Sequence, residues 1–167
     1  MKTAVLFFLI PIVGIAQMNF EKKLPSNAPY QTEIISGDGV SAYGDLDNDG
    51  DLDLITTVSA YTVNYTRVYL NENGNFIRQS SFNPVNFNGY SGLVIFDRNQ
   101  DGNLDFISSG YDSNSSFNTN FYYGDGTGNF TEDPSFNIVG LNAPSILVDD
   151  LTGDLKEDIL ISGTQTG

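Results

Sequence analysis

The stretch GDLDNDGDLDLI, residues 44–55, places five aspartates within nine residues. They are Asp45, Asp47, Asp49, Asp51 and Asp53. Carboxylates this close repel one another, because at about 4 Å and an effective dielectric constant of about 20 each pair costs on the order of 4 kcal/mol. The stretch therefore indicates a solvated acidic loop, a plain turn or a cage for a cation.

Two other stretches align with this one, so the loop belongs to a repeat. They are VIFDRNQDGNLDFISS (94–109) and LVDDLTGDLKEDILIS (147–162), and the first loop acids Asp45, Asp97 and Asp150 lie 52 and 53 residues apart. A second landmark keeps step: VYLNENGNF (68–76) and YYGDGTGNF (122–130) both end in Gly-Asn-Phe, 54 residues apart. Two landmarks with nearly the same period indicate internal repetition.

Each unit has the pattern of β structure. Short apolar stretches precede the acidic loops at 40–43, 93–96 and 146–148, and others follow them at 54–58, 106–108 and 159–161. The stretch TRVYL (66–70) alternates between two faces, residues 71–75 read as a turn, and FIRQS (76–80) returns as a hairpin partner. Four antiparallel strands in a repeat of this length predict an all-β fold of β-propeller blades.

We expect the repeats near 40–90, 91–144 and 145–167, the last incomplete, within a single repeat region at 17–167. A closed propeller has four to eight blades, or roughly 210–420 residues at this period. The chain supplies fewer than three units, which predicts a piece of a longer array.

Alternating oxygen-bearing residues in a tight loop predict a calcium site, because Ca²⁺ takes six to eight oxygen ligands. Glycine at the sixth position, Gly50 or Gly102, permits the sharp turn. The third loop has Leu155 there, so its site is expected to be weaker or absent. The predicted ligands in the first loop are Asp45, Asp47, Asp49, Asp53 and the carbonyl of Asp51; in the second, Asp97, Asn99, Asp101, Asp105 and the carbonyl of Asn103; in the third, Asp150, Thr152, Asp154, Asp158 and the carbonyl of Lys156.

Two other interpretations fit the loops less well. An EF-hand needs a glutamate at position twelve and flanking helices, whereas position twelve is Thr56, Ser108 or Ile161 and the flanks read as strands. A simple Asp-Gly hairpin turn would explain one loop, but not three in register with aspartate at positions one, five and nine.

The pattern Asp-x-Asp-x-Asp-Gly-x-x-Asp, a hydrophobic strand and the later YLNENGNF resemble the FG-GAP/VCBS-type repeat, over about residues 40–167. That family includes integrin-α-like propellers and many exported bacterial proteins. The resemblance implies a β-propeller with calcium-bound loops, usually serving cell adhesion or recognition, and it assigns the ligands to the positions named above.

Composition excludes several function classes. The chain has 7 Lys+Arg against 21 Asp+Glu, and its net charge of −14 argues against binding to nucleic acid or to an anionic membrane surface. It has no cysteine and no histidine, which removes disulfides, thiolate ligands, ordinary zinc sites and the Ser-His-Asp triad. Twelve of the 21 acids lie in the three loops, so divalent cations are the favoured partners.

The N-terminus has the layout of a secretory signal peptide. Lys2 precedes an apolar run from Ala4 to Ile15, and small residues follow, with cleavage expected after Ala16. The run is short for a membrane span, so we expect residues 1–16 to be removed and a secreted or cell-surface protein with no membrane span in the mature chain.

These patterns predict a secreted, non-catalytic calcium-binding module, and the family resemblance implies a role in adhesion or in glycan or protein recognition. The alternative is the accessory propeller region of a larger exported enzyme, such as a polysaccharide-degrading hydrolase. The motif GDGTG (124–128) is expected to be a hairpin turn rather than a phosphate loop. Six aromatic residues could line a glycan site, but core packing is the favoured interpretation for them; they are Tyr61, Tyr65, Tyr111, Phe117, Phe121 and Tyr122.

Overall fold

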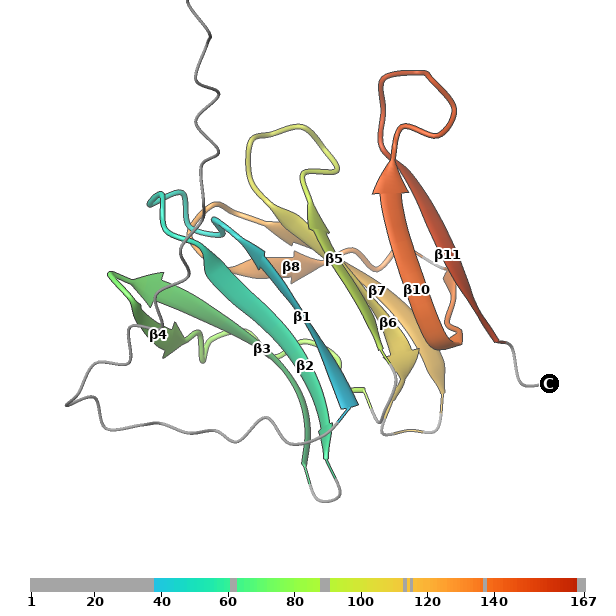
Figure 1. Ribbon diagram of the computed structural model, residues 1–167, viewed down its shortest axis with the longest axis horizontal. Helices are drawn as coiled ribbons and strands as arrows, with labels where there is room; N and C mark the ends of the chain where they lie inside the picture. The colour runs from blue at the N-terminus through green and yellow to red at the C-terminus, as the bar shows by residue number, and fades with distance from the viewer. Residues whose placement is uncertain are drawn as a thin grey trace, which may run out of the picture. The chain divides into compact units, whose positions relative to one another are not determined.

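The computed structural model describes residues 38–60, 63–87, 91–112, 114, 116–136 and 138–164. These residues form three antiparallel sheets, all within one compact unit, 34–167 (Figure 1). The predicted signal peptide lies outside the described residues. No helix long and apolar enough to cross a membrane occurs in the described part of the chain.

The first sheet contains four strands in sequential order. They are β1 (Asp38–Gly44), β2 (Asp53–Ala60), β3 (Val63–Glu72) and β4 (Asn75–Arg78). Hairpin pairing aligns Tyr43 with Leu54 and Leu54 with Tyr69, so these three residues lie in one row across the sheet. The β3–β4 turn falls at Asn73 and Gly74, which both have positive φ angles, as type I′ hairpin turns require.

The second sheet repeats this order and adds a short edge strand. It contains β5 (Gly92–Phe96), β6 (Asp105–Tyr111), β7 (Phe117–Gly124) and β8 (Phe130–Glu132), and β9 (Ile138–Val139) pairs with β7. The third sheet contains only β10 (Asn142–Asp149) and β11 (Asp158–Thr164). The prediction of about four strands per repeat is confirmed in the first two units, while β9 was not anticipated.

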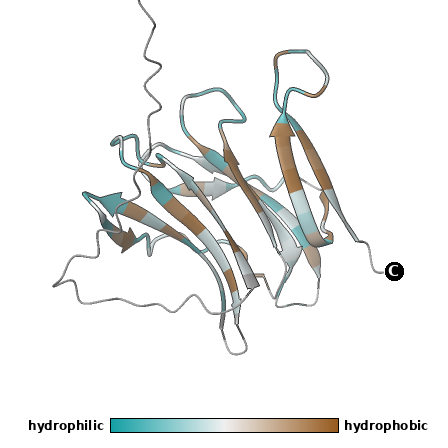
Figure 2. Ribbon diagram, in the orientation of Figure 1, coloured by the Kyte–Doolittle hydropathy of each residue, from teal (hydrophilic) through white to brown (hydrophobic). Residues whose placement is uncertain are grey.

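Apolar residues between adjacent sheets hold the units together, and Figure 2 shows hydrophobic residues concentrated along the strands. Between the first two sheets, Ile55 and Val68 pack with Phe106 and Tyr122 in one buried cluster. On the opposite face of the second sheet, Phe96, Ile107 and Phe121 form another cluster, against which four residues of the third sheet pack: Ile146, Val148, Ile159 and Ile161. Each sheet thus stacks on the next through alternate faces of its strands, as blades of a propeller do.

Most aromatic residues predicted to be core are buried or half-buried. Phe121 and Tyr122 are fully buried, while Tyr65, Tyr111 and Phe117 are half-buried. Burial also raises the pKa of the Tyr122 hydroxyl to about 12, and this hydroxyl accepts a hydrogen bond from the backbone of Val85 at 3.1 Å. The core prediction is confirmed for Phe121 and Tyr122, and Tyr61 lies outside the described residues.

Candidate metal-binding loops

The three acidic loops occupy equivalent places in the three sheets. We call residues 45–53 the first loop, 97–105 the second and 150–158 the third, each numbered from position one to nine. They connect β1 to β2, β5 to β6 and β10 to β11, and in Figure 1 all three loops lie at the same end of their sheets. The repeat therefore brings three similar sets of oxygen atoms to one edge of the stacked sheets.

The carboxylate at position one folds each loop around itself. Asp45 Oδ1 accepts a hydrogen bond from the backbone N–H of Asp49 at 3.1 Å, and Asp45 Oδ2 accepts one from Gly50 at 3.0 Å. The same two bonds recur from Asp101 and Gly102 to Asp97, and from Asp154 and Leu155 to Asp150, over 2.8–3.2 Å. This carboxylate thus orders the loop through its own backbone.

Two left-handed residues complete the turn in each loop. Positive φ angles occur at position four (Asn48, Gln100, Gly153) and at position six (Gly50, Gly102, Leu155). Leucine disfavours this region because its Cβ crowds the backbone. The third loop nevertheless adopts the fold of the other two, with φ of 66° at Leu155.

Replacing this leucine should stabilise the protein. Leu155 is 87% exposed, so Leu155→Gly removes little packing and relieves left-handed strain of about 1–2 kcal/mol, of which about 0.4–1 kcal/mol is returned as unfolded-chain entropy. Urea unfolding in chelator should show a small net gain. The reverse change in the second loop, Gly102→Leu, is the matched control and should lower stability; a gain there would contradict the explanation.

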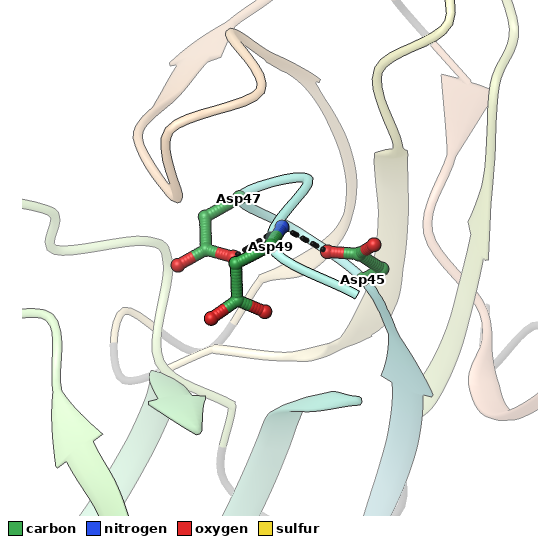
Figure 3. Close-up of side chains that lie close together, drawn as sticks. All are labelled: Asp45, Asp47 and Asp49. Atoms are coloured by element: carbon green, nitrogen blue, oxygen red, sulfur yellow. Dashed lines mark hydrogen bonds between the residues drawn. The ribbon is translucent and has the colours of Figure 1, made fainter. Parts of the chain in front are cut away.

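Three carboxylates of the first loop converge on one point. Asp45, Asp47 and Asp49 each offer one oxygen, and these oxygens all lie within 4.8 Å of one another (Figure 3). Oxygens bound to one Ca²⁺ at 2.3–2.6 Å lie at most about 5 Å apart. The donor set is all hard oxygen and its spacing suits this ion, so the first loop fits calcium.

Comparison with known protein families identifies this arrangement. Residues 45–108 match the family model of the FG-GAP-like repeat. These residues are therefore similar to an FG-GAP-like repeat. The match runs from position one of the first loop to β6, so it includes both of the loops that keep glycine at position six. No curated protein and no solved structure matched the chain.

The all-β stacked sheets and this match agree with FG-GAP-type propeller blades. In the described part of the chain, three mutually close acidic groups occur only in the first loop of the FG-GAP-like repeat. The second loop has Asn99 at position three, and the Asn99 amide donates to Asp101 Oδ2 at 2.8 Å. The third loop has Thr152 there, whose backbone N–H donates to Asp158 Oδ2 at 2.9 Å.

Crowding of the carboxylates changes their acidity in the FG-GAP-like repeat. Burial raises the pKa of Asp47 most, and the negative charge of Asp53 raises it further. In the second loop, by contrast, the backbone N–H of Asn103 and the Asn99 amide lower the pKa of Asp101. Position three of the second loop is the neutral Asn99, so only the first loop has a negative charge at this position.

Asp47→Asn should therefore act in opposite directions with and without calcium. Asparagine already occupies position three of the second loop, so the loop tolerates it, and its Oδ1 can still accept from the Asp49 N–H, now 3.3 Å away. In chelator the variant should be slightly more stable, by a few tenths of a kcal/mol, because this half-exposed charge is screened. In saturating calcium it should be less stable than the wild type. Thermal unfolding in both buffers checks the sign, and a variant less stable in chelator would contradict the crowding argument.

Position nine has a structural role that sequence patterns alone did not reveal. Asp53 is fully buried, and its two oxygens accept hydrogen bonds from the backbone N–H of Leu46 at 2.7 Å and of Asn71 at 2.8 Å. Asp105 does the same with Arg98 and Gly124, at 3.0 and 2.9 Å. Each carboxylate therefore joins its loop to the end of the third strand in the same sheet.

Burial also raises the pKa of Asp105, in spite of these two bonds. A cation nearby would offset this cost of burying a charge. A carboxylate oxygen can accept a hydrogen bond and bind calcium together, so the ligand role of Asp53 and Asp105 stays a prediction.

The carbonyl ligands at position seven also stay predictions. The structure shows their backbone N–H groups, which donate to the position-five carboxylate at 2.8–3.0 Å in all three loops: Asp51 to Asp49, Asn103 to Asp101 and Lys156 to Asp154.

The prediction that GDGTG (124–128) is a hairpin turn is confirmed, because residues 125–129 form the turn between β7 and β8. Asp125 Oδ1 organises this turn by accepting from the N–H groups of Thr127 and Asn129.

Proposed function

We propose that this chain is an exported, non-catalytic repeat module that binds calcium through its acidic loops and serves in adhesion or in recognition of glycans or proteins. The observation that carries the calcium part is the cluster of Asp45, Asp47 and Asp49, with one oxygen from each within 4.8 Å of the others. Export rests on the signal-peptide pattern of residues 1–16. The recognition role rests on the FG-GAP-like repeat at 45–108.

The charge of the chain supports a cation as partner. A net charge of −14 stabilises bound divalent ions and opposes contact with nucleic acid. Each loop is also preordered by hydrogen bonds from its own backbone to position one. A preordered loop loses less conformational entropy when calcium binds.

Isothermal titration of calcium into chelator-treated protein tests the proposal. We expect binding at the first two loops, with dissociation constants near 10⁻⁴–10⁻³ M, as is usual for extracellular modules. The double variant Asp45→Asn/Asp49→Asn should lose the first site. Glu72→Gln, which removes one exposed charge outside the loops, should bind as the wild type does. No calcium-dependent heat or signal in the wild type would contradict the proposal.

A further inference from the structure

The first loop does not stand alone in its own repeat. Asn48, at position four, donates from Nδ2 to Oδ1 of Asn103, at position seven of the second loop, at 3.1 Å. Asn48 lies between Asp47 and Asp49, two of the three clustered carboxylates. Asn103 carries the carbonyl predicted to bind the cation of the second loop. One hydrogen bond therefore joins the two candidate sites.

The turn between β7 and β8 of the second sheet supports this bond. The N–H of Gly128 donates to the carbonyl of Leu46, at position two of the first loop, at 3.1 Å. Gly126 packs against both amides: a Cβ there would clash with Asn103 Oδ1 and lie 2.6 Å from Asn48 Nδ2. Leu46 in turn donates its N–H to Asp53. The second repeat thus holds the first loop at positions two and four.

We propose that the second repeat positions the first loop for its cation, and that cation binding at the first and second loops is positively coupled through Asn48 and Asn103. This inference rests on the proposed calcium function. A cation in the second loop fixes the backbone of Asn103 and thereby its side chain. The hydrogen bond from Asn48 to this side chain then orders the segment between Asp47 and Asp49. The first loop then loses less conformational freedom when its own cation binds, and thermodynamic linkage makes the effect reciprocal.

The third loop provides an internal comparison. Among the described residues, no hydrogen bond joins the second loop to the third. Coupling should therefore involve only the first pair.

A double-mutant cycle tests the coupling. Asn48→Gly removes the donor and tolerates the φ of 60° at this position, and Asn103→Ala removes the acceptor while keeping the backbone carbonyl. We would measure calcium affinity at the first loop by calorimetry, with the second loop intact and with it disabled by Asp97→Asn/Asp101→Asn. Circular dichroism in chelator verifies that each variant is folded.

An intact second loop should raise the calcium affinity of the first loop roughly fivefold, the lower end of typical coupling. Each single variant should abolish that gain, the double variant should cause no further loss, and Glu72→Gln, at an exposed position outside the loops, should leave the gain unchanged. Equal first-loop affinities with and without a working second loop would overturn the coupling alone. Losses of first-loop calcium affinity that simply add in the Asn48→Gly/Asn103→Ala double variant would also overturn the coupling. No calcium binding at any loop would overturn the proposed function and the coupling together.

Discussion

Asp53→Ala should unfold much of the protein even when calcium is absent. The Asp53 side chain is 0% exposed, and its oxygens accept from Leu46 at 2.7 Å and from Asn71 at 2.8 Å. Hydrogen bonds to charged groups contribute about 1.5–3 kcal/mol each, and a buried N–H left without an acceptor adds its desolvation cost. We expect a loss of about 3–6 kcal/mol, a large part of the stability of a typical domain.

Urea unfolding in chelator measures this loss without any contribution from metal. Asp49→Ala is the matched control, because it removes an aspartate from the same loop at an exposed position. The Asp49 side chain accepts one hydrogen bond, from the N–H of Asp51 at 2.8 Å, so the cost should be about 1 kcal/mol. Equal losses in the two variants would contradict the structural role assigned to position nine.

Phe106→Ala should destabilise the protein by about 3–5 kcal/mol, the usual range for a buried phenylalanine. Phe106 is 0% exposed on β6 and packs in the cluster with Ile55 and Val68 of the first sheet. Its ring stacks on Tyr122 with centroids 4.5 Å apart and meets the edge of Phe130 at 5.0 Å. Truncation leaves a cavity at the point where the first two sheets meet, so both sheets lose support.

Phe76→Ala is the control, because it makes the same Phe-to-Ala change at a position on β4 that is 51% exposed. It should cost less than about 1 kcal/mol, as most surface substitutions do. Thermal and urea unfolding of both variants compare the two positions. Similar small losses would mean that the sheets do not depend on each other through the Phe106 cluster.

Local patterns in the sequence predicted the repeats, the strands and the acidic loops because their causes are local. Alternation of apolar residues marks a strand, and aspartates at alternate positions with glycine at position six mark the loop. The oxygens of Asp45, Asp47 and Asp49 converge because four residues of backbone fold around Asp45. The third loop keeps this fold in spite of Leu155, because Asp150 makes the same backbone bonds.

Contacts between distant segments could not be predicted in this way. The sequence pattern predicts Asp53 only as a metal ligand. Its hydrogen bond from the N–H of Asn71 depends on the pairing of β2 with β3, which the local pattern does not reveal. The turn at 125–129 was recognised as a turn, but its contact with Leu46 depends on how the second sheet stacks on the first. Position two shows the same dependence: Leu46 is buried, whereas Leu151 is 53% exposed.

Thermal unfolding of the wild-type chain, with calcium and with chelator, tests directly whether the acidic loops hold a cation. At a calcium concentration 100 times the dissociation constant, each occupied site adds about 2.7 kcal/mol. We expect a clear rise in melting temperature with calcium, which Asp45→Asn/Asp49→Asn should reduce and Glu72→Gln should leave unchanged. A melting temperature that is the same in calcium and in chelator would contradict the claim that these loops hold a cation.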